Sequence, residues 1–104
     1  MRDIEEYAKA QDRYYAANDE NFISGDSPIV LDVYATLKTF GKFGSIKCPS
    51  STGTILVEIS TDGTTYQQQF VVDKYETFEL IGIKINKIRI THSGTNSAYR
   101  IFVR

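Results

Sequence analysis

Apolar and polar residues alternate along most of the chain after residue 28. The segments 29–38 and 55–59 place an apolar side chain at every second position. A period of two is typical of a β-strand with one buried face. The same reading predicts further strands over residues 43–48, 77–81, 82–85, 88–92 and 97–103. About seven short strands separated by turn residues indicate a mainly β protein, a β-sandwich of the jelly-roll type.

The Asp62-Gly63 pair predicts a tight hairpin between two of these strands. Asp-Gly is a strong signal for a two-residue turn, because such turns need positive φ angles. A turn at these residues would place Ile59 opposite Tyr66 and Ile55 opposite Phe70. Both pairs are apolar and lie on one face, so turn chemistry and hydrophobic pattern predict the same register.

A second hairpin is predicted at residues 93–96, where Ser-Gly-Thr-Asn separates two alternating segments. A four-residue turn there would pair Ile90 with Tyr99 and Ile88 with Ile101. We therefore expect the last two strands to be neighbours in one sheet.

The alternation changes phase between the Ile83/Ile85 pair and the Ile88/Ile90 pair. A one-residue slip turns every later side chain to the other face. The slip predicts a bulge or a corner at Asn86-Lys87.

The first part of the chain has a different composition. Alanines are concentrated before residue 18, and Asp3 with Glu6 resembles a helix-capping pair. We predict a helix over residues 4–18, then a linker that ends in the turn-forming residues 24–28. The expected organisation is an N-terminal helical arm and linker (1–28) followed by a β-sandwich domain (29–104). One face of the predicted helix carries Ile4, Tyr7, Ala8, Tyr14 and Tyr15.

A helix of about 15 residues is marginal alone in water, so this one must dock on something. It could lie on its own β domain or on a neighbouring subunit. Residues 1–20 carry three cationic and six anionic side chains, whereas residues 80–104 carry five cationic and no anionic ones. Such opposite charges favour contacts between identical copies. The candidate interface residues are Ile4, Tyr7, Tyr14, Tyr15, Arg100, Phe102 and Arg104, the last three forming an aromatic–arginine patch.

Composition argues against several other functions. The net charge of −1 gives no bulk attraction to nucleic acid or to an anionic membrane. No apolar run approaches the ~20 residues needed to span a bilayer, and the acidic start of the chain does not resemble a signal peptide. With one cysteine (Cys48) and one histidine (His92), the sequence predicts no disulfide, catalytic site, cofactor site or metal site.

A carbohydrate-binding jelly-roll module is the alternative function. Exposed tyrosines such as Tyr34, Tyr66 or Tyr75 could stack on a sugar ring. The absence of tryptophan weakens this reading, since sugar-binding platforms commonly use the larger ring.

Three segments, Ile55–Tyr66, Ile88–Thr91 and Ser93–Arg100, together resemble the small β-sandwich modules of tailed-bacteriophage virions. They also resemble discoidin-like and carbohydrate-binding jelly rolls. The virion resemblance implies a structural protein, used in capsid decoration, as a head fibre or as a head–tail accessory. It further implies synthesis in the host cytoplasm, a final location in the virion, and contacts with copies of itself or other virion proteins.

Overall fold

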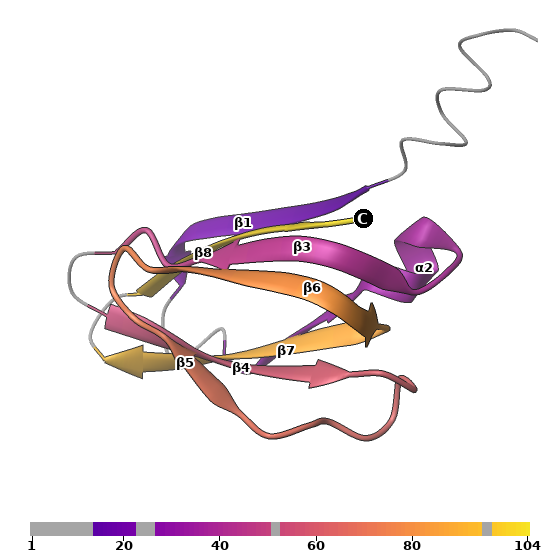
Figure 1. Cartoon of the computed structure of the whole chain (residues 1–104). Helices are drawn as coiled ribbons and strands as arrows, with labels where there is room; N and C mark the ends of the chain where they lie inside the picture. The colour runs from indigo at the N-terminus through magenta and orange to yellow at the C-terminus, as the bar shows by residue number, and fades with distance from the viewer. Residues whose placement is uncertain (1–13, 23–26, 51–52, 95–96) are drawn as a thin grey trace, which may run out of the picture.

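The computed structural model describes residues 14–22, 27–50, 53–94 and 97–104, which form two antiparallel four-stranded sheets (Figure 1). Sheet A contains, in spatial order, β1 (Tyr15–Phe22), β8 (Ser97–Val103), β3 (Gly41–Lys47) and β6 (Thr77–Ile85). Sheet B contains β2 (Ile29–Asp32), β7 (Lys87–Gly94), β4 (Gly53–Ser60) and β5 (Phe70–Val72). The mainly β class predicted from the alternation is confirmed, with eight strands in the described part of the chain.

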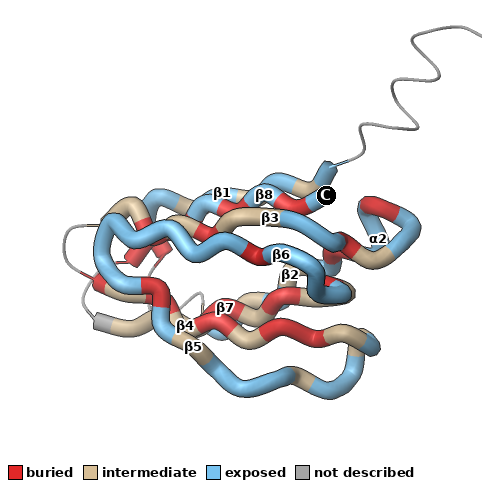
Figure 2. Tube along the Cα trace, in the orientation of Figure 1, coloured by how far each residue is buried: buried red, intermediate tan, exposed pale blue. Residues whose placement is uncertain are grey.

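The two sheets face each other, and one hydrophobic core fills the space between them (Figure 2). Sheet A contributes Phe22, Ile46 and Ile101, and sheet B contributes Ile55 and Ile90, all of them buried. Alternate residues of each strand therefore point inward, and the residues between them form the two outward faces of the molecule. Burying about twenty side chains in this way is the main source of stability for such a fold.

The predicted helix over residues 4–18 is wrong for residues 15–18, which lie in strand β1; residues 4–13 lie outside the described residues. Strand β1 pairs with β8 in the register Tyr15↔Val103 and Ala17↔Ile101. Helix propensity is a weak preference of less than about 1 kcal/mol per residue, and these cross-strand hydrogen bonds and core contacts override it. Tyr15 and Ala17 pack against the core.

The predicted strand over residues 29–38 is correct for β2 but wrong after Asp32. Residues Val33–Leu37 form the short helix α2. The Asp32 side chain caps it by accepting a hydrogen bond from the Ala35 amide (3.1 Å), and Lys38 ends it in the left-handed conformation. Val33 and Leu37 are both buried. Residues at positions i and i+4 share a face in a helix as well as in a strand, so the period-two pattern could not distinguish them.

The turn at Asp62-Gly63 is present, and Gly63 has the predicted positive φ of 88°. The predicted register is wrong, because Val57 pairs with Phe70 and Ser60 bridges to Tyr66. The Asp62 carboxylate accepts hydrogen bonds from the amides of Thr64 and Thr65, both at 2.8 Å. These bonds extend the turn beyond two residues, which shifts the partner strand by two positions.

The predicted β7–β8 hairpin is also wrong, because the two strands lie in different sheets. Strand β7 pairs with β2 and β4, whereas β8 pairs with β1 and β3. The chain crosses between the sheets after β7. The Ser97 hydroxyl lies 2.7 Å from the Thr54 carbonyl oxygen and 2.9 Å from that of Ser93, so it links the start of β8 to strands β4 and β7 of sheet B.

The predicted corner at Asn86-Lys87 is confirmed. Strand β6 of sheet A ends at Ile85, and β7 of sheet B begins at Lys87. The backbone N–H of Asn86 donates to the backbone carbonyl of Ser60 (2.8 Å). The backbone carbonyl of Asn86 accepts from the backbone N–H of Tyr34 (2.9 Å). The segments predicted as separate strands over 77–81 and 82–85 form the single strand β6, which bends at Gly82 with a φ of 72°.

Candidate functional site

The outward side chains of sheet A, which we call face A, form three rows that run across the strands. The polar row consists of Asn18, Arg100, Lys47 and Thr77, which are successive cross-strand partners. The middle row consists of Ala16, Phe102, Ser45 and Glu79, paired in the same way. The apolar row consists of Arg104, Phe43 and Ile81. Cross-strand partners have Cβ atoms about 5 Å apart, so each row is a continuous surface.

Phe102 stands in the centre of face A because β8 is a central strand of the sheet. Its side chain is 43% exposed. Tyr14 stacks on it, with ring centroids 5.3 Å apart and an angle of 19° between the rings. Strands β8 and β3 approach closely at this point, since a Cβ on Gly44 would lie 2.5 Å from the Phe102 carbonyl oxygen. The absence of a side chain at Gly44 therefore helps to hold Phe102 in place.

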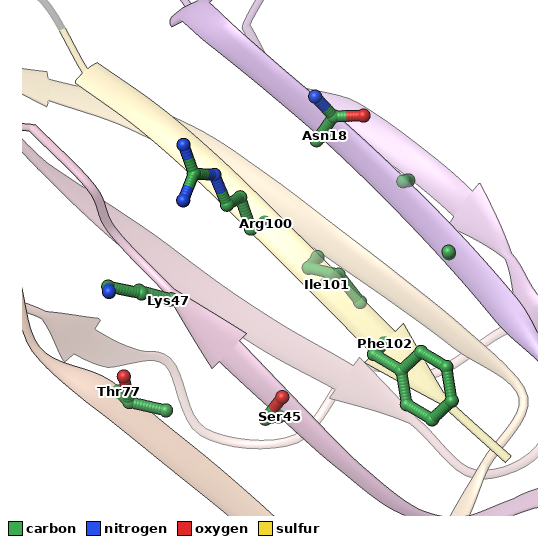
Figure 3. Close-up of a pocket in the computed structure, with 9 residues that line it drawn as sticks. Asn18, Ser45, Lys47, Thr77, Arg100, Ile101 and Phe102 are labelled. Carbon is green, nitrogen blue, oxygen red and sulfur yellow. The ribbon is translucent and has the colours of Figure 1, made fainter.

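A shallow hollow of about 350 Å³ lies beside Phe102 and touches all four strands of sheet A (Figure 3). Ala16 and Ser45, the small neighbours of Phe102 in the middle row, leave the space for it. Its lining residues are Ala16, Ala17, Asn18, Ser45, Lys47, Thr77, Arg100, Ile101 and Phe102. A second hollow of about 210 Å³ touches Phe102, Ser45 and residues of the apolar row. Face A is therefore uneven, with an aromatic ring between two depressions.

The polar row is rich in positive charge. Arg100 and Lys47 lie directly opposite each other on neighbouring strands. Arg100 donates a hydrogen bond from Nε to Glu20 at 2.6 Å, in an ion pair whose side chains are about half exposed. Lys47 forms no ion pair with any described residue. Adjacent like charges destabilise a sheet unless another group balances them.

The outward side chains of sheet B, which we call face B, form a different arrangement around Arg89. The Nε and Nη2 atoms of Arg89 donate to the two oxygens of Glu58, each at 3.0 Å. The Arg89 guanidinium also lies 4.1 Å from the centre of the Tyr66 ring. The hydrogen bonds that Arg89 donates to the Glu58 carboxylate raise the pKa of Arg89 above its ordinary value. Val30, Leu56 and Val71 complete this face.

Only some of the candidate interface residues predicted from the sequence lie together in the structure. Arg100, Phe102 and Arg104 share face A, as their alternation predicted, and Tyr14 joins them by stacking on Phe102. Tyr15 instead packs against its own core, where burial and the nearby Asp32 charge raise the pKa of its hydroxyl. Ile4 and Tyr7 lie outside the described residues.

Sequence reasoning missed the contribution of β3 and β6 to this surface. Lys47, Phe43 and Ile81 come from segments far from residues 100–104, and only the strand order brings them together. The signal was present in part, because Phe43 and Lys47 lie in a strand that was correctly predicted. What the sequence could not supply was the identity of that strand's neighbours.

Cys48 and His92 lie apart from face A. The Cys48 thiol is buried and lies 3.3 Å from the Gly53 carbonyl oxygen, to which it donates. The His92 ring packs edge-on against Phe22, with ring centroids 6.2 Å apart. Within residues 14–22, 27–50, 53–94 and 97–104, no group of three or more His, Cys, Asp or Glu side chains is placed to hold a metal ion. The helical part of these same segments includes no span long and apolar enough to cross a membrane.

Face A is thus the surface of the described chain that combines exposed aromatic rings, incompletely paired cations and two hollows. Comparison of the chain with models of known protein families and with curated protein sequences finds no match.

Proposed function

We propose that this protein is a jelly-roll β-sandwich module with a structural role, and that it binds copies of itself or other components of a tailed-phage virion. The strand orders β1-β8-β3-β6 and β2-β7-β4-β5 support the jelly roll, which viral capsid and lectin domains use. The resemblance of residues 55–66 to phage modules favours a virion as the assembly. Fold alone does not determine function, so the proposal depends on the chemistry of face A.

The observation that carries the proposal is the apolar row with its arginine. Phe43 and Ile81 lie opposite each other at 51% and 67% exposure, and Arg104 pairs with Phe43 through two backbone hydrogen bonds. Tyr14 and Phe102 extend this surface across the sheet. Aromatic and arginine side chains are enriched in protein interfaces, and contiguous exposed apolar surface commonly marks a binding site. We infer that the apolar row is buried in the assembled state.

Self-association of the full chain tests this proposal. We expect a concentration-dependent mass in sedimentation equilibrium, and we expect Ile81→Glu to shift it toward the monomer. The matched control is Val71→Glu, because Val71 is also an aliphatic residue on an edge strand and is 53% exposed on face B. A self-association that both substitutions weaken equally would contradict a specific role for the apolar row.

A second candidate function is saccharide binding, and the hollow beside Phe102 favours it. An exposed aromatic ring next to hydroxyl and amide side chains can stack on a sugar and bond to its hydroxyl groups. Ser45, Thr77 and Asn18 supply such groups around the 350 Å³ hollow. This role uses the polar and middle rows, so it is compatible with an assembly contact through the apolar row.

A further inference from the structure

The two positive charges of the polar row are balanced only in part by direct ion pairs within the described chain. Arg100 and Lys47 are cross-strand partners at the centre of face A, on two strands that each have neighbours on both sides. Like charges in directly opposed positions cost stability, so a chain selected only for folding would gain from an acid at one of them. Glu79 is the acid of the neighbouring row, and it lies opposite Ser45 rather than opposite Lys47.

Glu20 uses only one of the hydrogen-bond donors of Arg100. Its carboxylate bonds to Nε at 2.6 Å, and no described residue bonds to the two terminal nitrogens of Arg100. A guanidinium can donate five hydrogen bonds, so donors remain for a second anion. Lys47, with three donors, has no acid partner in the described chain. Together these two side chains present unused donors at the edge of the hollow (Figure 3).

The remaining walls of the hollow are suited to a ring-shaped polar ligand. Phe102 projects beside it from the same strand as Arg100 (Figure 3), and its exposed surface can stack on a flat apolar patch. Asn18, Ser45 and Thr77 offer one amide and two hydroxyl groups around the floor. The hollow thus combines an aromatic stacking surface, neutral hydrogen-bonding groups and two adjacent cations. These groups together match a sugar ring that bears a carboxylate.

We propose that the polar row and the hollow beside Phe102 bind a saccharide that carries carboxylate groups, such as a chain of uronate units. Arg100 and Lys47 bind the carboxylate, Phe102 packs on the sugar ring, and Asn18, Ser45 and Thr77 bond to the hydroxyl groups. This inference rests on the saccharide-binding role, the second function proposed above, and it specifies the ligand as acidic.

The position of the hollow favours a saccharide over an acidic peptide. Strands β8 and β3 pair on both sides, so their backbone amides and carbonyls are already hydrogen-bonded within sheet A. A peptide that adds as a strand needs a free edge, and the edges of this sheet are β1 and β6. The hollow lies between these edges, and its polar side chains suit a ligand whose hydroxyl and carboxylate groups lie around its rim.

Calorimetric titration of the full chain with trigalacturonate tests the proposal, with its fully methyl-esterified form as the neutral control. We expect saturable binding of the acid and at least about tenfold weaker binding of the ester, because charge-assisted hydrogen bonds are lost. Binding of the acid is expected to weaken as salt is added. Equal affinity for the acid and the ester, or no binding of either, overturns the proposal.

Substitutions then locate the site. Lys47→Gln is expected to weaken binding of the acid by about tenfold, since it removes one charged donor and keeps most of the side-chain length. Lys87→Gln is the matched control, because Lys87 is a strand lysine of sheet B, opposite Ser60; we expect it to leave the affinity unchanged. Phe102→Leu is expected to weaken binding of the acid and the ester by the same factor, because stacking on the sugar ring does not depend on the carboxylate charge. Equal effects of the two lysine substitutions overturn the site assignment.

Two further measurements test whether other polyanions bind equally well and whether ligand binding is separate from self-association. Polyglutamate or single-stranded DNA that binds as tightly as trigalacturonate overturns the assignment to a saccharide, since charge alone would then explain the affinity. Sedimentation equilibrium of the Lys47→Gln variant reports on self-association separately. Loss of ligand binding with unchanged self-association supports a ligand site distinct from the apolar row. Loss of both in a variant with unchanged thermal unfolding contradicts that separation.

Discussion

Faces A and B are each built on a sheet of four strands, yet the ion pairs of their arginine side chains differ. On face B, Arg89 is held by both oxygens of Glu58 and by the ring of Tyr66. On face A, Arg100 makes one bond to Glu20, and its neighbour Lys47 has no acid partner among the described residues. The Glu58 side chain is 17% exposed, whereas that of Glu20 is 48% exposed. Arg89 of face B is therefore satisfied by groups of the described chain, whereas Arg100 and Lys47 of face A keep donors without an acid partner there.

This difference indicates which surface is available for binding. A cation that already has a bidentate carboxylate and an aromatic neighbour gains little from a new anion. A cation with free donors, beside a hollow and an exposed aromatic ring, gains more. The contrast also identifies a structural role for Glu58, Arg89 and Tyr66, since together they join β4, β7 and the loop between β4 and β5.

The largest expected effect on stability comes from the turn at Asp62-Gly63, which precedes Tyr66 and places its ring against Arg89. Gly63→Val is expected to lower the free energy of unfolding by about 1–3 kcal/mol, because valine is strained at a φ of 88°. A Cβ there would also lie 3.0 Å from the Asn86 side chain. Chemical denaturation measures the loss. Gly63→Asn is the control, since asparagine tolerates this conformation, and equal losses in the two variants would contradict backbone strain as the cause.

A smaller effect on the free energy of unfolding is expected from replacing the carboxylate partner of the arginine on each face. Glu20→Gln should change the free energy of unfolding by no more than about 0.5 kcal/mol, as for other exposed ion pairs. Glu58→Gln should cost more, because it leaves a partly buried Arg89 with a weaker acceptor. Thermal unfolding of the two variants, in low and high salt, compares them directly. Equal stability of the two variants would remove the contrast between the faces.

The sequence predicted the strands better than it predicted their partners. Alternation located β4 and the corner at Asn86, because it records which side of the backbone is buried. It failed at residues 33–37, where the buried Val33 and Leu37 fit a helix as well as a strand. At Asp62, the carboxylate bonds to two amides and lengthens the turn, an effect that depends on side-chain geometry rather than on residue type.

Strand pairing is a long-range property, and this limited the prediction of the site. Turn-forming residues at 93–96 suit a hairpin and a crossing between sheets equally well, because both reverse the chain. The face shared by Arg100, Phe102 and Arg104 followed from local alternation and was predicted correctly. The contributions of Lys47 and Ile81 required the order of strands in sheet A, which no local pattern contains.

The smallest expected effect concerns Asp62, which holds the same turn of the β4–β5 loop by its charge. Hydrogen bonds from the backbone amides of Thr65 and Thr64 lower the pKa of Asp62 below its ordinary value of 3.8. Because the folded state prefers the ionised carboxylate, this stabilisation is fully present above pH 3.8 and is lost as the pH falls through the lower folded-state pKa. We expect Asp62→Asn to be slightly less stable than the wild type at neutral pH, and the difference to vanish in acid. Asp62→Ser keeps a hydrogen-bond acceptor without a titrating group and should behave in the same way. Unfolding midpoints measured across the acid range check this, and a constant difference at every pH would show that the charge of Asp62 does not stabilise the turn.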